Sequence, residues 1–587
     1  MRILGAAALG LATATFGAQP GLAKEDPREF YDGLEYRNIG PYRGGRATAA
    51  AGVASDPLTY YMGATGGLFK TTNAGVSWFP VSDEDFGTGP VGSIDVAPSD
   101  PNVVVVGMGE SPFRGVASSQ GDGVYISTDA GESWTHAGLK DTRQISSVKI
   151  HPTNPDVIWV AAQGDSWSAN PNRGVYKTTD GGRTWRRVLA GENDHTGAVD
   201  LEYDANNPRI LYAAMWDHDR EPWEIRSGGP GSGLWKSTDG GETWAELTED
   251  LPKLKGKMGV APSPAKPGRV WAVIEASEGD GEGGGLYRSE DYGESWTKVN
   301  SSREIQARSW YYMHIFADPK DAETVYVMNA PFMKSVDGGK TFVVVDMPHT
   351  AQHDLWLNPD DPSIMANAND GGATISLDGG ATWSTQHNQP TAQFYRVITD
   401  NQIPYRLYAG QQDNSTVAIR SRAPDGRIGR DDYHSIGGGE SAHVAFDPDD
   451  PRYIYAGSYL GYLTEYDAET NATRFIAAYP ETKFGVAPKE RKYRSNWNAP
   501  VLGSAHDPSV IFHAGNHVMD SRDRGQSWAE YSPDLTRNEE ATQGPGGRPI
   551  TNEVSENYNT FLSLAESPHE KGVLWAGSDD GRVHITR

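Results

Sequence analysis

Two aspartates stand in short links rich in glycine and amide side chains, where a carboxylate can face a cleft. Asp370 belongs to the link Asn-Asp-Gly-Gly at 369–372, and Asp413 to Gln-Gln-Asp-Asn at 411–414. Two carboxyl groups across a cleft can hydrolyse a glycosidic bond, with retention at about 5–5.5 Å and inversion at about 6.5–9.5 Å. We expect Asp370 to be the acid and Asp413 the base or nucleophile. The alternative is that both carboxylates cap their own tight turns.

Three longer links combine carboxylates with aromatic side chains and are candidates for ligand binding. They read GESPFRGVASSQGDG from residue 109, QGDSWSANPNRG from 163 and WDHDREPWEIRSGGPGSG from 216. An aromatic face suits a sugar ring or an apolar peptide group. The binding candidates in these links are Glu110, Arg114, Trp167, Trp216 and Trp223. The alternative is that the loops pack on one another and close a central channel.

Other motifs carry weaker chemical signals. Glu440 stands in Gly-Gly-Gly-Glu-Ser at 437–441 and is a further candidate for substrate binding. No lysine or helix start follows this glycine run, which argues against a nucleotide site. His353 and Asp354 form the His–Asp pair most suited to chemistry, with a core hydrogen bond as the alternative. Nucleophile-elbow, HExxH and EF-hand patterns are missing, so we expect no cofactor and no metal.

A short phrase that recurs eight times determines which elements position these residues. It reads Ser or Thr, any residue, Asp or Asn, any residue, Gly, any residue, Ser or Thr, and an aromatic. Its acidic or amide positions are Asn73, Asp129, Asp180, Asp239, Asp291, Asp337, Asp378 and Asp523. The Asp and Ser side chains suit capping of backbone N–H groups, and the aromatic ring suits packing between sheets. We therefore interpret these boxes as structural.

The residues around each box predict four strands per repeat. The first strand ends at a turn such as Asp-Pro at 100–101, the second follows that turn, the third runs into the box and the fourth leaves it. Four-stranded sheets repeated around an axis form a propeller. The fold class is therefore all-β, with tandem β-propellers of four-stranded antiparallel blades. The Asp-Pro turns and boxes share one face, and the links that carry the candidate residues share the other.

The number of repeats predicts two propellers. The first seven boxes mark one blade each, and the long gap before Asp523 holds two degenerate units that begin near Arg406 and Tyr453. An eleventh unit begins near Val573. We expect a seven-bladed propeller at 24–389 and an incomplete one of about four blades at 390–587. A fragment of a longer protein is the favoured explanation, and a closing strand at 36–39 is the alternative.

Composition and the N-terminus limit the partners. The formal charge is −26, which disfavours nucleic acid because nucleic-acid binding needs basic surface. Arg2, an apolar stretch at 3–18 and small residues at 21 and 23 predict a signal peptide at 1–23 and a secreted or periplasmic protein. No other segment suits a membrane span. The chain has no cysteine, so packing alone must hold it. Its oligomeric state stays open.

The boxes resemble those of the Asp-box (BNR) repeat propellers, which include sialidases, the sortilin-type receptor propeller and two-propeller xyloglucanases. The segments YRNIGPYRGGR at 36–46, NDGGATIS at 369–376 and GQQDNST at 410–416 look closest to bacterial exported proteins labelled glycosyl hydrolase-like or sortilin N-terminal-like. The resemblance implies action on, or binding of, extracellular glycan. The alternative is a non-catalytic, sortilin-like propeller that binds peptide or protein. The chain departs from the sialidase pattern at Arg43–Arg46, and its first link, 64–67, lacks the carboxylate of the xyloglucanase pattern.

Overall fold

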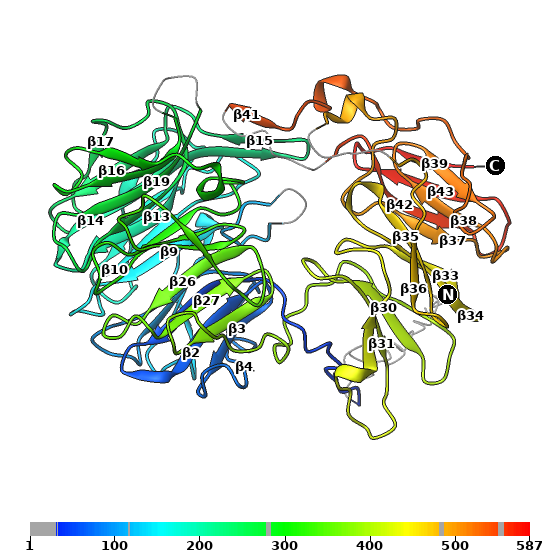
Figure 1. Cartoon of the computed structure of the whole chain (residues 1–587), viewed down its shortest axis with the longest axis horizontal. Coiled ribbons are helices and arrows are strands. Elements are labelled where there is room, and N and C mark those ends of the chain that lie inside the picture. Colours follow the sequence, from blue (N-terminus) through cyan, green and yellow to red (C-terminus); the bar gives the residue numbers. More distant parts are fainter. Residues whose placement is uncertain are drawn as a thin grey trace, which may run out of the picture. The chain divides into compact units, whose positions relative to one another are not determined.

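The computed structural model describes residues 31, 33–114, 118–277, 283–480, 486–549 and 557–586. The predicted signal peptide lies outside them. The chain divides into two compact units, Met1–Ile39 and Gly40–Arg587. The strands below all belong to the second unit, whose fold is all-β with tandem propellers (Figure 1). The expected domain boundary at 389 stays a prediction, because Gly40–Arg587 is one compact unit.

Seven antiparallel sheets follow one another in the first propeller, each built from consecutive strands. Their strands are β1 (Ala47–Val53), β2 (Asp56–Ala64), β3 (Gly67–Thr71), β4 (Phe79–Pro80); β5 (Val91–Val96), β6 (Val104–Met108), β7 (Val124–Ser127), β8 (Thr135–His136); β9 (Ile145–Ile150), β10 (Ile158–Ala162), β11 (Gly174–Thr178), β12 (Arg186–Ala190); β13 (Thr196–Asp204), β14 (Asn207–Glu221), β16 (Gly233–Ser237), β17 (Ala245–Leu247); β18 (Lys255–Pro262), β19 (Val270–Ala276), β20 (Gly285–Ser289), β21 (Thr297–Asn300); β22 (His314–Ala317), β23 (Val325–Met328), β24 (Phe332–Ser335), β25 (Val343–Val345); and β26 (Gln352–Leu357), β27 (Met365–Asn369), β28 (Gly372–Ser376).

Four more sheets follow in the described part of the second propeller. Their strands are β29 (Ile398–Thr399), β30 (Arg406–Gly410), β31 (Thr416–Arg420), β32 (Tyr433–Ser435); β33 (Val444–Asp447), β34 (Asp450–Gly457), β35 (Leu463–Asp467), β36 (Ala472–Phe475); β37 (Val501–Gly503), β38 (Ile511–Ala514), β39 (Val518–Ser521), β40 (Ala529–Glu530); and β42 (Phe561–Glu566), β43 (Leu574–Ser578), β44 (Val583–Ile585). The described helices are short 3-10 turns in the links, and none of them is long and apolar enough to span a membrane.

The boxes cap turns and pack aromatic rings between sheets, as the sequence predicts. In the second blade, Asp129 Oδ1 accepts the backbone N–H of Ser133 at 2.9 Å, and Asp129 Oδ2 accepts its hydroxyl at 2.6 Å. These hydrogen bonds lower the pKa of Asp129 to about 2. The box tryptophan, Trp134, is buried, and its Nε1 donates to the carbonyl of Val81 in the preceding blade at 2.7 Å. Each box therefore closes its own turn and wedges its ring against the neighbouring sheet.

The fourth blade differs from the predicted pattern, because its second strand runs on into the link. β14 continues to Glu221 and turns back as β15 (Glu224–Ser227), which pairs in parallel with β41 (Gly547–Pro549) from the C-terminal part of the chain (Figure 1). Trp216 and His218 lie two positions apart on the same face of this strand, and both are fully buried. The segment is therefore a strand that joins the two propellers, and not an open loop.

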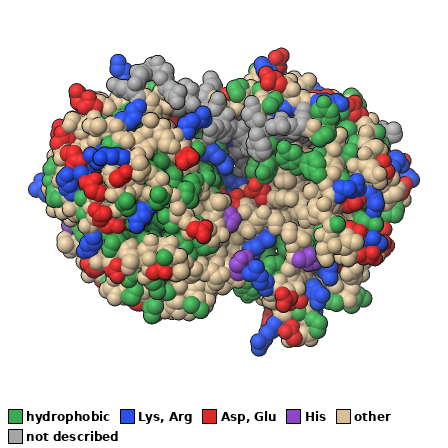
Figure 2. Space-filling model, in the orientation of Figure 1, with side chains coloured by type: hydrophobic (Ala, Val, Ile, Leu, Met, Phe, Trp, Pro, Cys, Tyr) green, Lys and Arg blue, Asp and Glu red, His purple; other side chains and the backbone are tan. Residues whose placement is uncertain are grey.

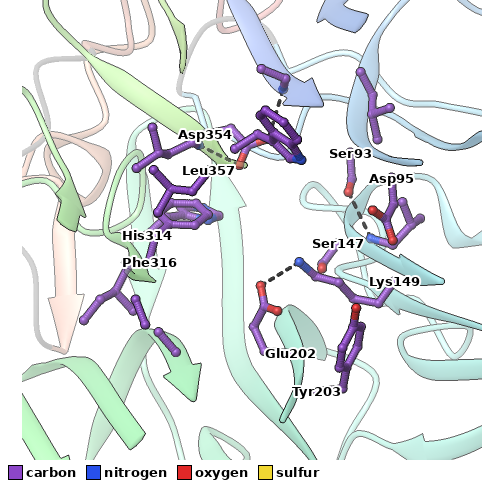
Figure 3. Close-up of a pocket in the computed structure, with 18 of the residues that line it drawn as sticks. Ser93, Asp95, Ser147, Lys149, Glu202, Tyr203, His314, Phe316, Asp354 and Leu357 are labelled. Carbon is purple, nitrogen blue, oxygen red and sulfur yellow. Dashed lines mark hydrogen bonds and ion pairs between the residues drawn. The ribbon is translucent and has the colours of Figure 1, made fainter. Parts of the chain in front are cut away.

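The innermost strands of the seven blades enclose a central channel of about 300 Å³ (Figure 3). Lys149 Nζ points toward Glu202 across the channel and pairs with its Oε1 at 2.6 Å. Asp95 accepts the N–H of Ile150 at 2.7 Å. The charged groups of the channel thus find partners in its own wall.

Candidate functional site

A second pocket, of about 230 Å³, lies where links from both propellers meet. Figure 2 shows the hollow between the two halves of the molecule, with acidic, basic and histidine side chains along it. The residues that line the pocket are Arg114, Arg308, Trp310, Tyr311, Tyr312, His349, Thr350, Ala351, Asp370, Gln412, Asp413, Glu440 and Trp497. Each belongs to a link between the second and third strands of a blade or between one blade and the next. All of them therefore lie on the face opposite the boxes.

The guanidinium of Arg46 holds the carboxyl groups of this site together. Arg46 directly precedes β1 and is buried. Its Nε donates to Asp370 Oδ1 at 2.8 Å, its Nη2 donates to Asp413 Oδ2, and its Nη1 lies 3.5 Å from Glu110 Oε1. The two aspartates that the sequence paired thus meet at one cation. Neither oxygen that contacts Arg46 caps the turn of its own link.

Two glycines let the chain before Arg46 reach this position. A Cβ on Gly44 would lie 2.0 Å from the carbonyl oxygen of Gly371, and a Cβ on Gly45 would lie 2.4 Å from that of Thr391. Real Cβ atoms do not approach so closely, so only glycine fits at either position. The sequence pattern at 43–46 indicates a family resemblance and a departure from the sialidase pattern, but it does not predict this structural role.

Asp370 is held as a carboxylate by three donors. Besides Arg46, the hydroxyl of Tyr311 lies 2.9 Å from both of its oxygens, and His353 Nε2 lies 2.7 Å from Oδ1. Burial alone raises the pKa of Asp370, but Arg46 and then His353 and Tyr311 outweigh burial and hold that pKa well below its ordinary range. These contacts favour the ionised form of Asp370, and the acid role expected for it stays a prediction that they do not support.

The predicted partner of His353 is also corrected. Asp354, its neighbour in sequence, accepts the backbone N–H of Ala50 at 3.0 Å instead of pairing with the imidazole. Successive side chains of a strand point to opposite faces, and both residues belong to β26. His353 therefore reaches Asp370 from strand β26 of the same blade, and Asp354 faces the central channel.

Glu440, predicted only as a binding residue, carries the proton of the site. Its Oε2 accepts the N–H of Asp413 at 3.1 Å and the amide of Gln412, and the same amide donates to Asp413 Oδ1 at 2.7 Å, so the two carboxyl groups adjoin. Burial and then the nearby charge of Asp413 raise the pKa of Glu440 to about 8. The raised pKa favours the protonated form of Glu440 near neutral pH, beside a carboxyl group that is paired with Arg46.

The predicted binding residues divide into two groups. Glu110 and Arg114 belong to the site: Glu110 faces Arg46, and Arg114 Nη2 donates to Gln412 Oε1 at 2.7 Å. The three tryptophans do not line the pocket. Trp216 stacks on His218 at 4.1 Å inside the core, so its ring is not available to a ligand. Trp167 is half-buried in its link, and half-buried Trp223 packs beside Tyr558 with ring centroids 5.0 Å apart.

A different set of rings forms the aromatic wall. Trp310, Tyr311 and Tyr312 come from the link before β22, and Trp497 comes from the link before β37. Arg308 lies over the ring of Trp310, with 4.9 Å between its guanidinium carbon and the ring centroid. The run Trp-Tyr-Tyr at 310–312 could have indicated this wall from the sequence. Three consecutive aromatic residues lack the alternation of apolar and polar positions that is typical of a strand.

Comparisons with known proteins agree with the fold and with a distant relationship to xyloglucanases. Residues 122–263 and 284–425 match the Sortilin-Vps10 family model, described as sortilin, neurotensin receptor 3. A xyloglucanase of a Paenibacillus species is 25% identical over 301 residues, 50% of this chain and 24% of that protein. One of Hypocrea jecorina is 22% identical over 418 residues, 60% of this chain and 48% of that protein. The chain thus spans less than half the length of these curated relatives.

Solved structures show the same two-propeller architecture. An ancestral GH74 enzyme matches with a TM-score of 0.57 and 16% identity over 94% of this chain and 77% of its own. The GH74 enzyme of Niastella koreensis matches with a TM-score of 0.53 and 14% identity, over 94% of this chain and 84% of its own. At this identity the likeness is one of fold.

Proposed function

We propose that the protein is an exported, glycoside hydrolase-like propeller that binds extracellular glycan in the pocket between its two propellers and cleaves it there. One observation carries the proposal: Gln412 Nε2 donates to both Glu440 and Asp413 in a single pocket, and burial there raises the pKa of Glu440 to about 8. Glycoside hydrolysis needs one carboxyl group that gives a proton and a second that is ionised. The xyloglucanases among its distant relatives and the predicted signal peptide support the class and the location.

The chemistry assigns one role to each carboxyl group. Glu440 donates its proton to the glycosidic oxygen as the bond from that oxygen to the anomeric carbon breaks. The carboxylate of Asp413, held beside Arg46, attacks the anomeric carbon from the opposite side. Water then hydrolyses the glycosyl ester, with the ionised Glu440 taking the proton from that water. We expect retention, which needs about 5–5.5 Å between the two carboxyl groups, so the entering sugar must first separate the adjoining Asp413 and Glu440.

The rest of the pocket suits a sugar ring. The half-buried Trp497 offers an aromatic face for the C–H surface of a pyranose, whereas the buried rings of Trp310 and Tyr312 form the wall of the pocket. Arg46 Nε donates hydrogen bonds to Asp370 and Tyr311, which hold the guanidinium in place. The Arg46 cation beside Asp413 therefore does not move when a ligand enters. The Asp413 carboxylate, fixed by this cation, is the preorganised group that stabilises a developing positive charge at the anomeric carbon.

Turnover is tested with a panel of plant, bacterial and fungal polysaccharides and an assay for new reducing ends. We expect Glu440→Gln and Asp413→Asn each to lower product release by about 10²–10⁴-fold, the usual contribution of a positioned acid or base. The exposed Glu84→Gln is the matched control and keeps the wild-type rate. The rate constant kcat/KM falls as the pH rises through about 8, because Glu440 then loses its proton. Unchanged release by Glu440→Gln contradicts the assignment.

One observation favours a second candidate, glycan or peptide binding without turnover. Asp370 and Asp413 both contact buried Arg46, and counter-ions locked in this way build a rigid binding surface. Under this alternative, the wild type binds a ligand of the panel tightly but releases no product above the background of Asp413→Asn.

A further inference from the structure

We propose that the pocket is selective for acidic glycans, and that Arg114 binds the carboxylate of a uronic acid residue. This inference rests on the proposed function and specifies the substrate class of the same site.

Arg114 is a buried cation that forms no direct ion pair with a carboxyl group among the described residues. Only 6% of the residue is exposed, and it lines the pocket. Its Nη2 donates to Gln412 Oε1 at 2.7 Å and to the hydroxyl of Tyr395 at 3.3 Å, both uncharged groups. Its Nη1 has no hydrogen-bond partner, and no ion pair of Arg114 occurs among the described residues. Burying a charged donor unpaired costs several kcal/mol, which an anionic ligand offsets.

Arg46, the other buried arginine of the site, differs from Arg114 in its ion pairs. Arg46 is as deeply buried as Arg114 but contacts three carboxyl groups. Two of these carboxyl groups, Asp370 and Asp413, line the same pocket but pair with Arg46, and none of the described carboxyl groups forms an ion pair with Arg114. Trp310, on the same wall, has a buried Nε1 that also lacks a partner. Two residues from different links that line one cavity thus each carry a buried N–H donor without a hydrogen-bond partner.

A carboxylate matches this pair of donors. It offers two oxygens in one plane, and the planar guanidinium binds such a group better than an ammonium does. The protonated state of Glu440 removes one negative charge from the pocket at neutral pH, so an acidic ligand meets less repulsion. A sulfate or phosphate ester presents three oxygens in a tetrahedral arrangement and needs more donors than these two.

Gln412 connects the anion site with the reacting carboxyl groups. Its Oε1 accepts from Arg114, and its Nε2 donates to Asp413 Oδ1 at 2.7 Å and to Glu440 Oε2. One amide side chain therefore spans the distance between them. A carboxylate at Arg114 belongs to the sugar at the cleavage point or to the sugar next to it, and not to a remote part of the chain.

The inference is tested by calorimetric titration of the whole protein with matched ligands. The probes are galacturonic acid oligomers and xylo-oligosaccharides that carry glucuronic acid, each beside its carboxyl-reduced counterpart. We expect the wild type to bind the acidic member of at least one pair about 10- to 100-fold more tightly, as for a charge-assisted hydrogen bond. The preference falls when the salt is raised from about 0.05 to 0.5 M, because salt screens the attraction.

Variants then locate the preference. Arg114→Gln is expected to bind both members of the pair equally, Arg114→Lys to keep part of the preference, and the exposed Arg183→Gln to keep all of it. Thermal unfolding followed by circular dichroism shows whether Arg114→Gln is folded, and the comparison of ligands on the wild type needs no variant. Equal binding of acidic and reduced oligomers overturns the inference but leaves the proposed function. Binding of sulfated glycans alone overturns the carboxylate assignment, and binding of no glycan overturns both proposals.

Discussion

Replacing Arg46 by glutamine removes the single cation that Glu110, Asp370 and Asp413 share. Breaking a buried ion pair by removing one partner costs about 3–5 kcal/mol, because the other charge stays buried without compensation. Asp370 keeps Tyr311 and His353 as donors, which reduces the loss at that group. We therefore expect Arg46→Gln to lower the free energy of unfolding by about 3–5 kcal/mol at pH 7, at the lower end if these donors compensate.

The pH dependence of this loss distinguishes an electrostatic role from simple packing. Arg46 and the other donors depress the pKa of Asp370 in the folded protein, so its stabilisation is present above the unfolded pKa of about 3.9. It is lost as the pH falls below that value toward the folded pKa. The difference between wild type and Arg46→Gln is therefore largest near neutral pH and shrinks under acidic conditions.

Urea unfolding followed by tryptophan fluorescence at a series of pH values measures this difference. Arg46→Lys is the matched control: it keeps the charge but has no planar fork for three carboxyl groups, so its loss should be intermediate. A loss below about 1 kcal/mol at pH 7, as for an exposed pair, would refute the reasoning. So would a loss of the same size at every pH.

Two further outcomes follow from the packing of the first propeller. Gly44→Ala places a Cβ 2.0 Å from the carbonyl oxygen of Gly371 and should cost about 3 kcal/mol or more in urea unfolding, whereas Gly66→Ala, with no atom within 4 Å, should cost little; equal costs contradict the close approach. Burial raises the pKa of Asp95 to about 6, so its contribution to stability is full below the unfolded pKa of about 3.9 and lost as the pH rises through 6. Asp95→Asn should remove that decline, and unfolding curves of both proteins with the same slope against pH would contradict it.

Part of the site could be predicted because the repeats order the links in space. Asp370 and Asp413 stand in equivalent links of consecutive blades, and repeating units place such links side by side at one face. The roles of the two residues were not predictable in the same way. Proton affinity depends on burial and on neighbours, and the neighbours of Asp370 include Arg46, more than 300 positions away in the chain. Trp216 was misplaced because the alternation of its strand continued past the expected end of the blade.

The amino-acid sequence by itself determined the architecture of this protein. The eight boxes form hydrogen bonds between residues a few positions apart, such as those of Asp129 with Ser133. Because such contacts are local, the amino-acid sequence predicts the turns and the position of each aromatic ring. The residues that line the pocket become known from the three-dimensional fold alone. Arg46, Arg114 and Glu440 come from three distant segments of the chain. Their protonation depends on burial and on neighbouring residues that are far away in the sequence, so spacing does not predict it.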